Sequence, residues 1–141
     1  MKNRKRAGRI FLFFGMMMIF GNFLGCAVEE TAAKKIRDIE FTVIEQSQIP
    51  PELSNIMEEK KKEGFKLTYA DKENLYLAVG YGEQKTGGYS ISADKCYLTK
   101  NAIYFGTTLT GPEKGEKINK VSSYPYIVIK TEYIDEPVVF E

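Results

Sequence analysis

From Phe65 onward, the sequence consists of short runs in which apolar and polar residues alternate, separated by brief stretches of turn-forming residues. Alternation with a period of two is typical of strands with one buried face, and short turns favour antiparallel neighbours. We expect strands at 65–69, 75–81, 89–93, 96–98, 102–110 and 124–129. This pattern predicts an antiparallel sheet that curls into a barrel or a sandwich.

Two details of these runs give sharper expectations. Asp94 and Lys95 interrupt the alternation and predict a bulge before Cys96. In the last run, the period of two places Ile127 and Ile129 on one face of the strand and Tyr126 and Val128 on the other. At least one of these faces should belong to the core.

One segment before the strands has a helical period instead. Leu53, Ile56 and Met57 recur at i, i+3 and i+4 and predict one apolar stripe. Pro51 suits the first turn of a helix, where a missing N–H costs nothing, and Gly64 suits the C-terminal stop.

The flanks of this helix complete the fold class. The lysine run 60–62 complements the helix dipole and is interpreted as a solvated helix end. Before the helix, the alternation over 38–46 predicts another half-buried strand. The expected class is therefore α+β, predominantly β, with one amphipathic helix.

The N-terminal region has the features of a bacterial lipoprotein signal. A basic start is followed at 10–23 by an apolar run too short to span a membrane. Phe23-Leu24-Gly25-Cys26 then resembles the lipobox, in which the cysteine thiol receives the lipid. We expect a signal peptide at 1–25, a lipid on Cys26, a tether over 26–37 and one domain over 38–141, with the protein held at the cell membrane or envelope, outside the cytoplasm.

Composition excludes several kinds of chemistry. Five of the 20 basic residues and none of the 19 acidic ones precede Cys26, so the rest of the chain carries a net charge of −4, with 15 basic against 19 acidic residues. This charge argues against nucleic acid as a partner. The chain has no histidine, and besides Cys26 its only thiol is Cys96, which we interpret as a small apolar strand residue.

These absences favour a protein without an enzymatic activity. Neither a histidine-activated nucleophile nor a histidine or cysteine metal site is expected, and we predict no cofactor and no disulfide framework. A Ser–Lys pair formed by Ser90 or Ser92 with Lys95 lacks a recognisable oxyanion hole. We interpret these residues as part of the solvent face of a strand.

The segment 82–91 joins two of the expected strands and concentrates glycine. Thr86, Gly87, Gly88 and Tyr89 combine a backbone free to adopt positive φ with an amphipathic ring. One interpretation is a hairpin turn whose glycines only satisfy geometry. The other is a partner-binding loop formed by these four residues.

Three sequence motifs together resemble a known family. They are Gly82-x-x-x-Thr86-Gly87-Gly88-Tyr89-x-Ile91, Thr110-Gly111-Pro112 with Gly115, and Ser123-Tyr124-Pro125-Tyr126. This combination resembles the C-terminal domain of PrcB, a subunit that stabilises a surface protease complex, over roughly Leu53 to Thr131. The resemblance implies a non-enzymatic, protein-binding lipoprotein of the bacterial envelope. It does not identify the partner of this chain, for which we take a secreted or surface protease as the candidate.

Two other functions stay open. The same loop is similar to that of chagasin-type cysteine-protease inhibitors, whose Asn-Pro-Thr-Thr-Gly-Tyr/Phe loop enters an active site; here Gln84-Lys85 stands in place of Asn-Pro. A protease inhibitor is therefore one alternative. An envelope lipoprotein that binds a small ligand is the other.

We predict that Cys26→Ser abolishes lipidation and maturation, because a serine hydroxyl lacks the nucleophilicity of the thiolate that accepts the lipid. Metabolic labelling with a radioactive fatty acid measures the outcome. The unaltered protein should carry label and partition into detergent, and the variant should do neither. Equal labelling of the two proteins would exclude Cys26 as the lipidated residue.

Overall fold

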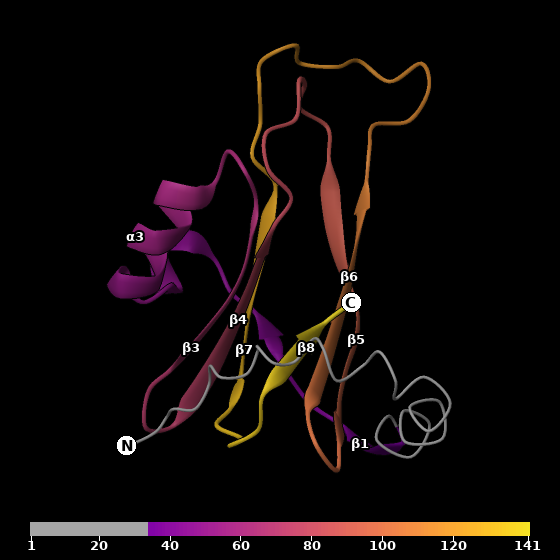
Figure 1. The fold of residues 1–141 in the computed structure, drawn as a ribbon. Helices are drawn as coiled ribbons and strands as arrows, with labels where there is room; N and C mark the ends of the chain where they lie inside the picture. Colours follow the sequence, from indigo (N-terminus) through magenta and orange to yellow (C-terminus); the bar gives the residue numbers. More distant parts are fainter. Residues whose placement is uncertain (1–33) are drawn as a thin grey trace, which may run out of the picture.

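The computed structural model describes residues 34–141, so the expected signal peptide and Cys26 lie outside the described residues. Residues 34–141 form a β-sandwich of two four-stranded sheets (Figure 1). The first sheet has the order β1-β5-β6-β8, with strands Lys35–Asp38, Ser90–Thr99, Ile103–Thr110 and Val138–Phe140. The second has the order β2-β7-β4-β3, with strands Thr42–Val43, Tyr126–Glu132, Asn74–Gly80 and Phe65–Ala70.

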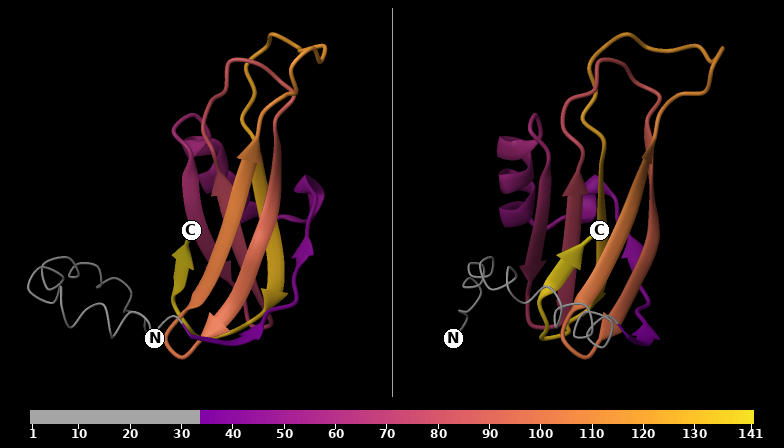
Figure 2. Two further views of the ribbon diagram at one scale, coloured as in Figure 1. Left: turned by 90° about the vertical axis from the view of Figure 1, so that its right-hand side faces the viewer. Right: turned by 45° about the vertical axis from the view of Figure 1, so that its right-hand side comes forward.

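Helical structure is confined to one side of this sandwich. A short 3₁₀ helix, η3, spans Gln46–Gln48, and the helix α3 spans Pro51–Lys60 and covers the outer face of the second sheet (Figure 2). The predicted predominance of β structure with one amphipathic helix is confirmed, and the architecture is the sandwich. None of the helices in residues 34–141 is long and apolar enough to cross a membrane.

Apolar residues gather into two clusters on either side of the second sheet. The cluster between the two sheets contains Ile39, Leu75, Leu77, Val79, Cys96, Ile103, Phe105, Ile127 and Ile129. The cluster beneath α3 contains Ile44, Ile49, Leu53, Met57, Phe65, Tyr76, Ala78 and Val128. The second sheet is therefore buried on both faces, whereas the first sheet contributes one face to the core.

This arrangement confirms the predicted alternation in β7. Ile127 and Ile129 point between the sheets, and Val128 points toward α3. Strands buried on both faces read as near-continuous apolar runs, which explains the sequence of β7 and of its neighbour β4. All seven residues of β4, from Asn74 to Gly80, pair antiparallel with β7, so these two strands form the centre of the second sheet.

The helix begins and ends as predicted, but its apolar stripe is narrower. Pro51 occupies the first turn, and Gly64 follows the helix with φ +95°, where its N–H donates to the Lys60 carbonyl oxygen at 3.0 Å. Leu53 and Met57 are buried against the sheet. Ile56 is 39% exposed, so its expected place in the stripe is wrong.

The predicted strand over 38–46 is wrong, because the chain crosses here from one sheet to the other. Ile39 N–H donates to the Cys96 carbonyl oxygen in the first sheet, and Ile44 N–H donates to the Val128 carbonyl oxygen in the second. A crossing divides the alternating run into two short strands, β1 and β2. The first part of β1, Lys35 to Arg37, comes from the stretch assigned to the tether.

Two further features concern the first sheet. The predicted bulge is confirmed by a register shift in β5 between Ala93 and Lys95, which joins the two expected strands into one. The strand β8 was not expected, although the run Val138-Val139-Phe140 after Pro137 has the composition of a strand. It pairs parallel with β6, so the expectation of a wholly antiparallel sheet is wrong for this pair.

We predict that Ile129→Ala lowers the free energy of unfolding by about 2–5 kcal/mol, because the truncation leaves a cavity at a fully buried position. The control is Ile36→Ala, since Ile36 is 61% exposed and should lose no more than about 0.5 kcal/mol. Urea unfolding of both variants measures the difference. Equal midpoints for the two variants would contradict the burial of β7 on its inner face.

Candidate functional site

Two loops project together from one end of the sandwich. One joins β4 to β5 over residues 81–89, and the other joins β6 to β7 over residues 111–125; we call them the tip loops (Figure 1). The second has no helix or strand of its own along its whole length. Loops longer than about 12–15 residues without secondary structure are uncommon in small domains and usually serve function.

Backbone hydrogen bonds join the two tip loops. Gln84 and Ser123 exchange both N–H···O bonds, at 2.8 and 3.0 Å, and form an isolated antiparallel bridge. The Gly87 N–H donates to the Asn119 carbonyl oxygen at 2.7 Å, and the Ser123 hydroxyl donates to the Thr86 carbonyl oxygen at 2.7 Å. The segment around Thr86 is therefore held from one side by the longer loop.

Glycines allow the loops to approach this closely. Gly88 has φ +90°, and a Cβ built on it would lie 3.0 Å from Pro112 Cβ. A Cβ built on Gly111 would lie 3.2 Å from the ring of Tyr89. The three motifs of the family resemblance therefore contact one another in space, with the first packed on the second at Gly88 and Tyr89 and on the third at Ser123.

The four residues predicted to bind a partner differ in their surroundings. Gly88 is exposed, whereas Thr86, Gly87 and Tyr89 are partly buried by the longer loop and the strand ends. The expected positive φ is confirmed at Gly88. Gly87 does not have positive φ, and its built Cβ would meet Asn119 Cβ at an ordinary 3.5 Å, so turn geometry does not account for this glycine. The binding role of the four residues stays a prediction.

The longer tip loop carries two exposed apolar side chains that the sequence interpretation did not single out. Ile118 is 40% exposed and Val121 is 65% exposed, amid the charged residues of 113–120. Apolar residues inside an otherwise polar loop were the available signal. Exposed aliphatic residues at a loop end are the type of side chain that a protein partner can cover.

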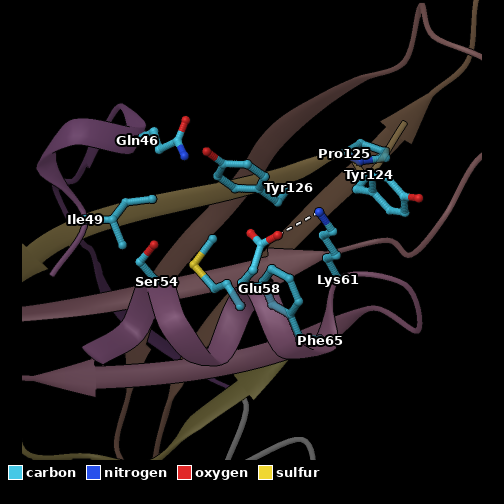
Figure 3. Close-up of a pocket in the computed structure, with 10 residues that line it drawn as sticks. Gln46, Ile49, Ser54, Glu58, Lys61, Phe65, Tyr124, Pro125 and Tyr126 are labelled. Carbon is cyan, nitrogen blue, oxygen red and sulfur yellow. Dashed lines mark hydrogen bonds and ion pairs between the residues drawn. The ribbon is translucent and has the colours of Figure 1, made fainter. Parts of the chain in front are cut away.

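A pocket of about 210 Å³ lies beside the tip, between α3 and the start of β7 (Figure 3). Ile49, Met57 and Phe65 form its apolar floor, and Tyr124-Pro125-Tyr126 forms one wall. The Tyr-Pro-Tyr motif therefore lines a cavity as well as starting a strand.

Lys61 also lines this pocket, where it contacts Glu58 and Tyr124. Its Nζ lies 2.7 Å from Glu58 Oε2 and 4.9 Å from the ring centroid of Tyr124. The hydrogen bond to Glu58 and that carboxylate's charge raise the pKa of Lys61 above its usual value, so the ammonium stays charged. Lys61 lies at the end of α3 with 40% of its side chain exposed, as a solvated helix end predicts, and its contact with Tyr124 is an addition that the lysine run did not indicate.

The described residues show little of the chemistry of catalysis. Burial raises the pKa of the Cys96 thiol to about 11, so this thiol is protonated and unreactive at neutral pH. Ser92 donates to Asp94 Oδ1 at 2.8 Å, and Thr108 donates to Asp94 Oδ2, so these groups form an exposed structural cluster at the bulge. Residues 34–141 contain no group of three acidic or thiol side chains that could hold a metal ion.

The tip lies opposite the end at which the described chain begins. β1 starts at Lys35, which pairs with Thr99 at the far end of β5, whereas Ser90 begins β5 at the tip. A strand of ten residues spans about 33 Å. The tip loops therefore lie about one strand length from the end of the sandwich that leads back toward Cys26 (Figure 2).

The fold and its loops define a small β-sandwich domain with a surface built at one end. Residues 75–132 match a family model described as PrcB C-terminal, and this match supports the resemblance drawn from the sequence motifs. The match runs from β4 to β7 and includes all three motifs that meet at the tip. Neither a curated protein nor a solved structure matches the chain.

We predict that Gly88→Ala lowers the free energy of unfolding by about 1–2 kcal/mol, because a Cβ is strained at positive φ and crowds Pro112. Gly87→Ala is the matched control and should change stability by no more than about 0.5 kcal/mol. Chemical denaturation of the two variants measures both values. The packing of the tip loops would be refuted by an equal loss of stability in the two variants.

Proposed function

We propose that the chain is a lipid-anchored, non-enzymatic protein of the bacterial cell envelope that holds and stabilises a secreted or surface protease through its tip loops. The observation that carries this proposal is the meeting of the three family motifs at one end of the sandwich. Residues from 82 to 126 are packed against each other there, and hydrogen bonds from the longer loop hold the segment at Gln84, Thr86 and Gly87.

The placement of the tip supports a role in binding. A lipid on Cys26 would hold the Lys35 end of the sandwich near the membrane and leave the tip directed away from it. The end of the domain farthest from the anchor is then the most accessible to a large exported partner.

The side chains at the tip support the same role. Val121 and Ile118 are exposed and do not belong to the core. Gly87 lacks a side chain although neither its φ nor its neighbours require a glycine, so its backbone is accessible beyond what the turn needs. A braced loop pair limits the conformational entropy lost on binding. This surface therefore suits a persistent complex.

A protease inhibitor that inserts its loop is the second candidate. The contact between Gly88 and Pro112 and the bonds of Gly87 and Thr86 to the longer loop hold the segment in one conformation, as an inserted loop requires. Inhibition of a cysteine or serine protease by the purified protein separates this candidate from stabilisation.

The proposal is tested by isolating the tagged full-length protein from intact cells after cross-linking and identifying the retained proteins by mass spectrometry. We expect an exported protease that is recovered with the protein and that is degraded faster in cells lacking it. Recovery of no protease, or an unchanged lifetime of the recovered one, would contradict the proposal.

The tip itself is tested with matched variants. Val121→Asp should lower recovery of the protease by about tenfold or more, because a charge replaces an apolar contact at the expected interface. Ile36→Asp is the control, since Ile36 is 61% exposed and Val121 is 65% exposed, but Ile36 lies at the opposite end. Melting curves should show both variants folded, and equal recovery of the protease would place the interface elsewhere.

A further inference from the structure

Part of β5 has an unpaired edge beside the tip. β1 pairs with Thr99, Leu98 and Tyr97, and the Ile39 N–H reaches the Cys96 carbonyl oxygen. The chain then leaves for the second sheet, where β2 pairs with β7. Within residues 34–141, no pairing covers β5 from Ser90 to Lys95 on this side (Figure 2).

The backbone groups that face this open edge can be assigned from the side chains. In a strand of L-residues, the face on which a side chain lies fixes the side to which its own N–H and C=O point. Cys96 and Leu98 belong to the inner face, and the Cys96 carbonyl oxygen points toward β1. Ile91 and Ala93 pack on the same inner cluster, so their N–H and C=O groups point to the open edge.

A pocket of about 320 Å³ borders this edge. Ile91 and Tyr89 line it from the first sheet and its loop, and Val43, Tyr126 and Ile127 line it from the second sheet. The pocket lies between residues of the two sheets, at a place that the segment between β1 and β2 does not cover. A strand paired with β5 would direct every second side chain toward the inner face, and the one beside Ile91 would enter this pocket.

The lining of the pocket indicates what such a strand would contain. It is mainly apolar and aromatic, and Glu45 is the one charged residue that lines it. An apolar side chain suits the interior, and a Lys or Arg next to it suits Glu45. The outward residues of the β5 edge, Ser90 and Ser92, are small and exposed, so a second strand meets no bulky or repelling side chain there.

We propose that the open edge of β5, from Ser90 to Ala93, binds an extended segment of the partner protease by strand addition. Main-chain hydrogen bonds to Ile91 and Ala93 would hold the segment, and the pocket beside Tyr89 would select an apolar residue flanked by a basic one. This inference deepens the proposed function and rests on it, because it names the way in which the protease is held.

The open edges of β3 and β6 lack the pocket. β3 is an edge strand of the second sheet, and β6 is unpaired beyond Phe105 on the side of β8. Neither strand contributes to the lining of the pocket beside Tyr89.

The experiment uses the full chain and the protease identified by cross-linking, presented whole and as short overlapping synthetic peptides. Ile91→Pro removes an N–H from the open edge and places a ring where a partner strand would pair. Leu109→Pro is the matched control, because Leu109 lies directly opposite Ile91 in the register and its N–H points to the open edge of β6. We expect Ile91→Pro to raise the Kd at least about tenfold and Leu109→Pro to leave it unchanged.

A second variant leaves the backbone of the sheet intact in case proline at Ile91 unfolds the domain. Val43 is 55% exposed at the pocket, so Val43→Arg should preserve the fold while filling the pocket mouth and repelling a basic partner residue. Its control is Ile36→Arg at the opposite end. We also expect slower hydrogen exchange at the Ile91 and Ala93 amides in the complex.

The possible outcomes distinguish the inference of strand addition from the proposed function on which it rests. Unchanged binding of the whole protease by folded Ile91→Pro and by Val43→Arg would overturn strand addition and leave the proposed function standing. A dimer of the chain that Ile91→Pro dissociates would assign the edge to a second copy and overturn the inference in the same way. Failure of the unaltered chain to bind the protease would overturn both.

Discussion

The pairing of β4 with β7 is the constraint on which the rest of the molecule depends. These two strands occupy the centre of the second sheet, and each is buried on both faces. Leu77 and Ile129 fill the space between the sheets, while Ala78 and Val128 fill the space beneath α3. Burial on both faces fixes the register, because a slip of one residue would exchange the two sets of side chains between differently shaped clusters.

The site follows from this centre by continuity of the chain. β4 ends at Gly80 and β7 begins at Tyr126, directly opposite each other in the register, so the two tip loops leave the sandwich at one place. Their backbones are then close enough for the Gln84–Ser123 bridge and for the contact of Gly88 with Pro112. A rigid core thereby positions loops that have few apolar contacts of their own.

The short N-terminal strands give the sandwich an asymmetric edge. Because the chain crosses between sheets after Ile39, it closes the sandwich near the end that leads toward Cys26 and leaves β5 open near the tip. The open edge, its pocket and the tip loops lie at the same end of the domain. This asymmetry suits the proposed function, in which a lipid-anchored domain would hold a partner away from the membrane.

Much of this could be inferred from the sequence because its signals are local. The alternation in β3 and β6, the apolar runs of β4 and β7, the helix limits at Pro51 and Gly64, and the bulge at Asp94 all reflect the conformation of neighbouring residues. The family motifs likewise identified the segments that form the tip. The residues of these motifs do not, however, indicate which of the segments contact one another in the folded domain.

The predictions from the sequence are wrong where contacts between distant residues outweigh the local pattern of apolar and polar residues. The alternation over 38–46 suits one strand, but the chain gains more by pairing Ile39 with the first sheet and Ile44 with the second. Ile56 fits the helical period and yet lies beyond the sheet that Leu53 and Met57 reach. The parallel pairing of β8 depends on an unoccupied edge of β6, and the sequence of β8 itself does not indicate that this edge is unoccupied.

The sequence by itself therefore determined the β-rich class, the helix, the glycine-bearing loop and the family, because these depend on period, turn chemistry and motif spacing. Only the tertiary structure decided that the second sheet is buried on both faces, that Gly88 and Tyr89 meet Pro112 and Gly111, and that β5 keeps an open edge beside a pocket. These features arise from contacts between residues far apart in the chain, and the energy of such contacts depends on how the two sheets pack together.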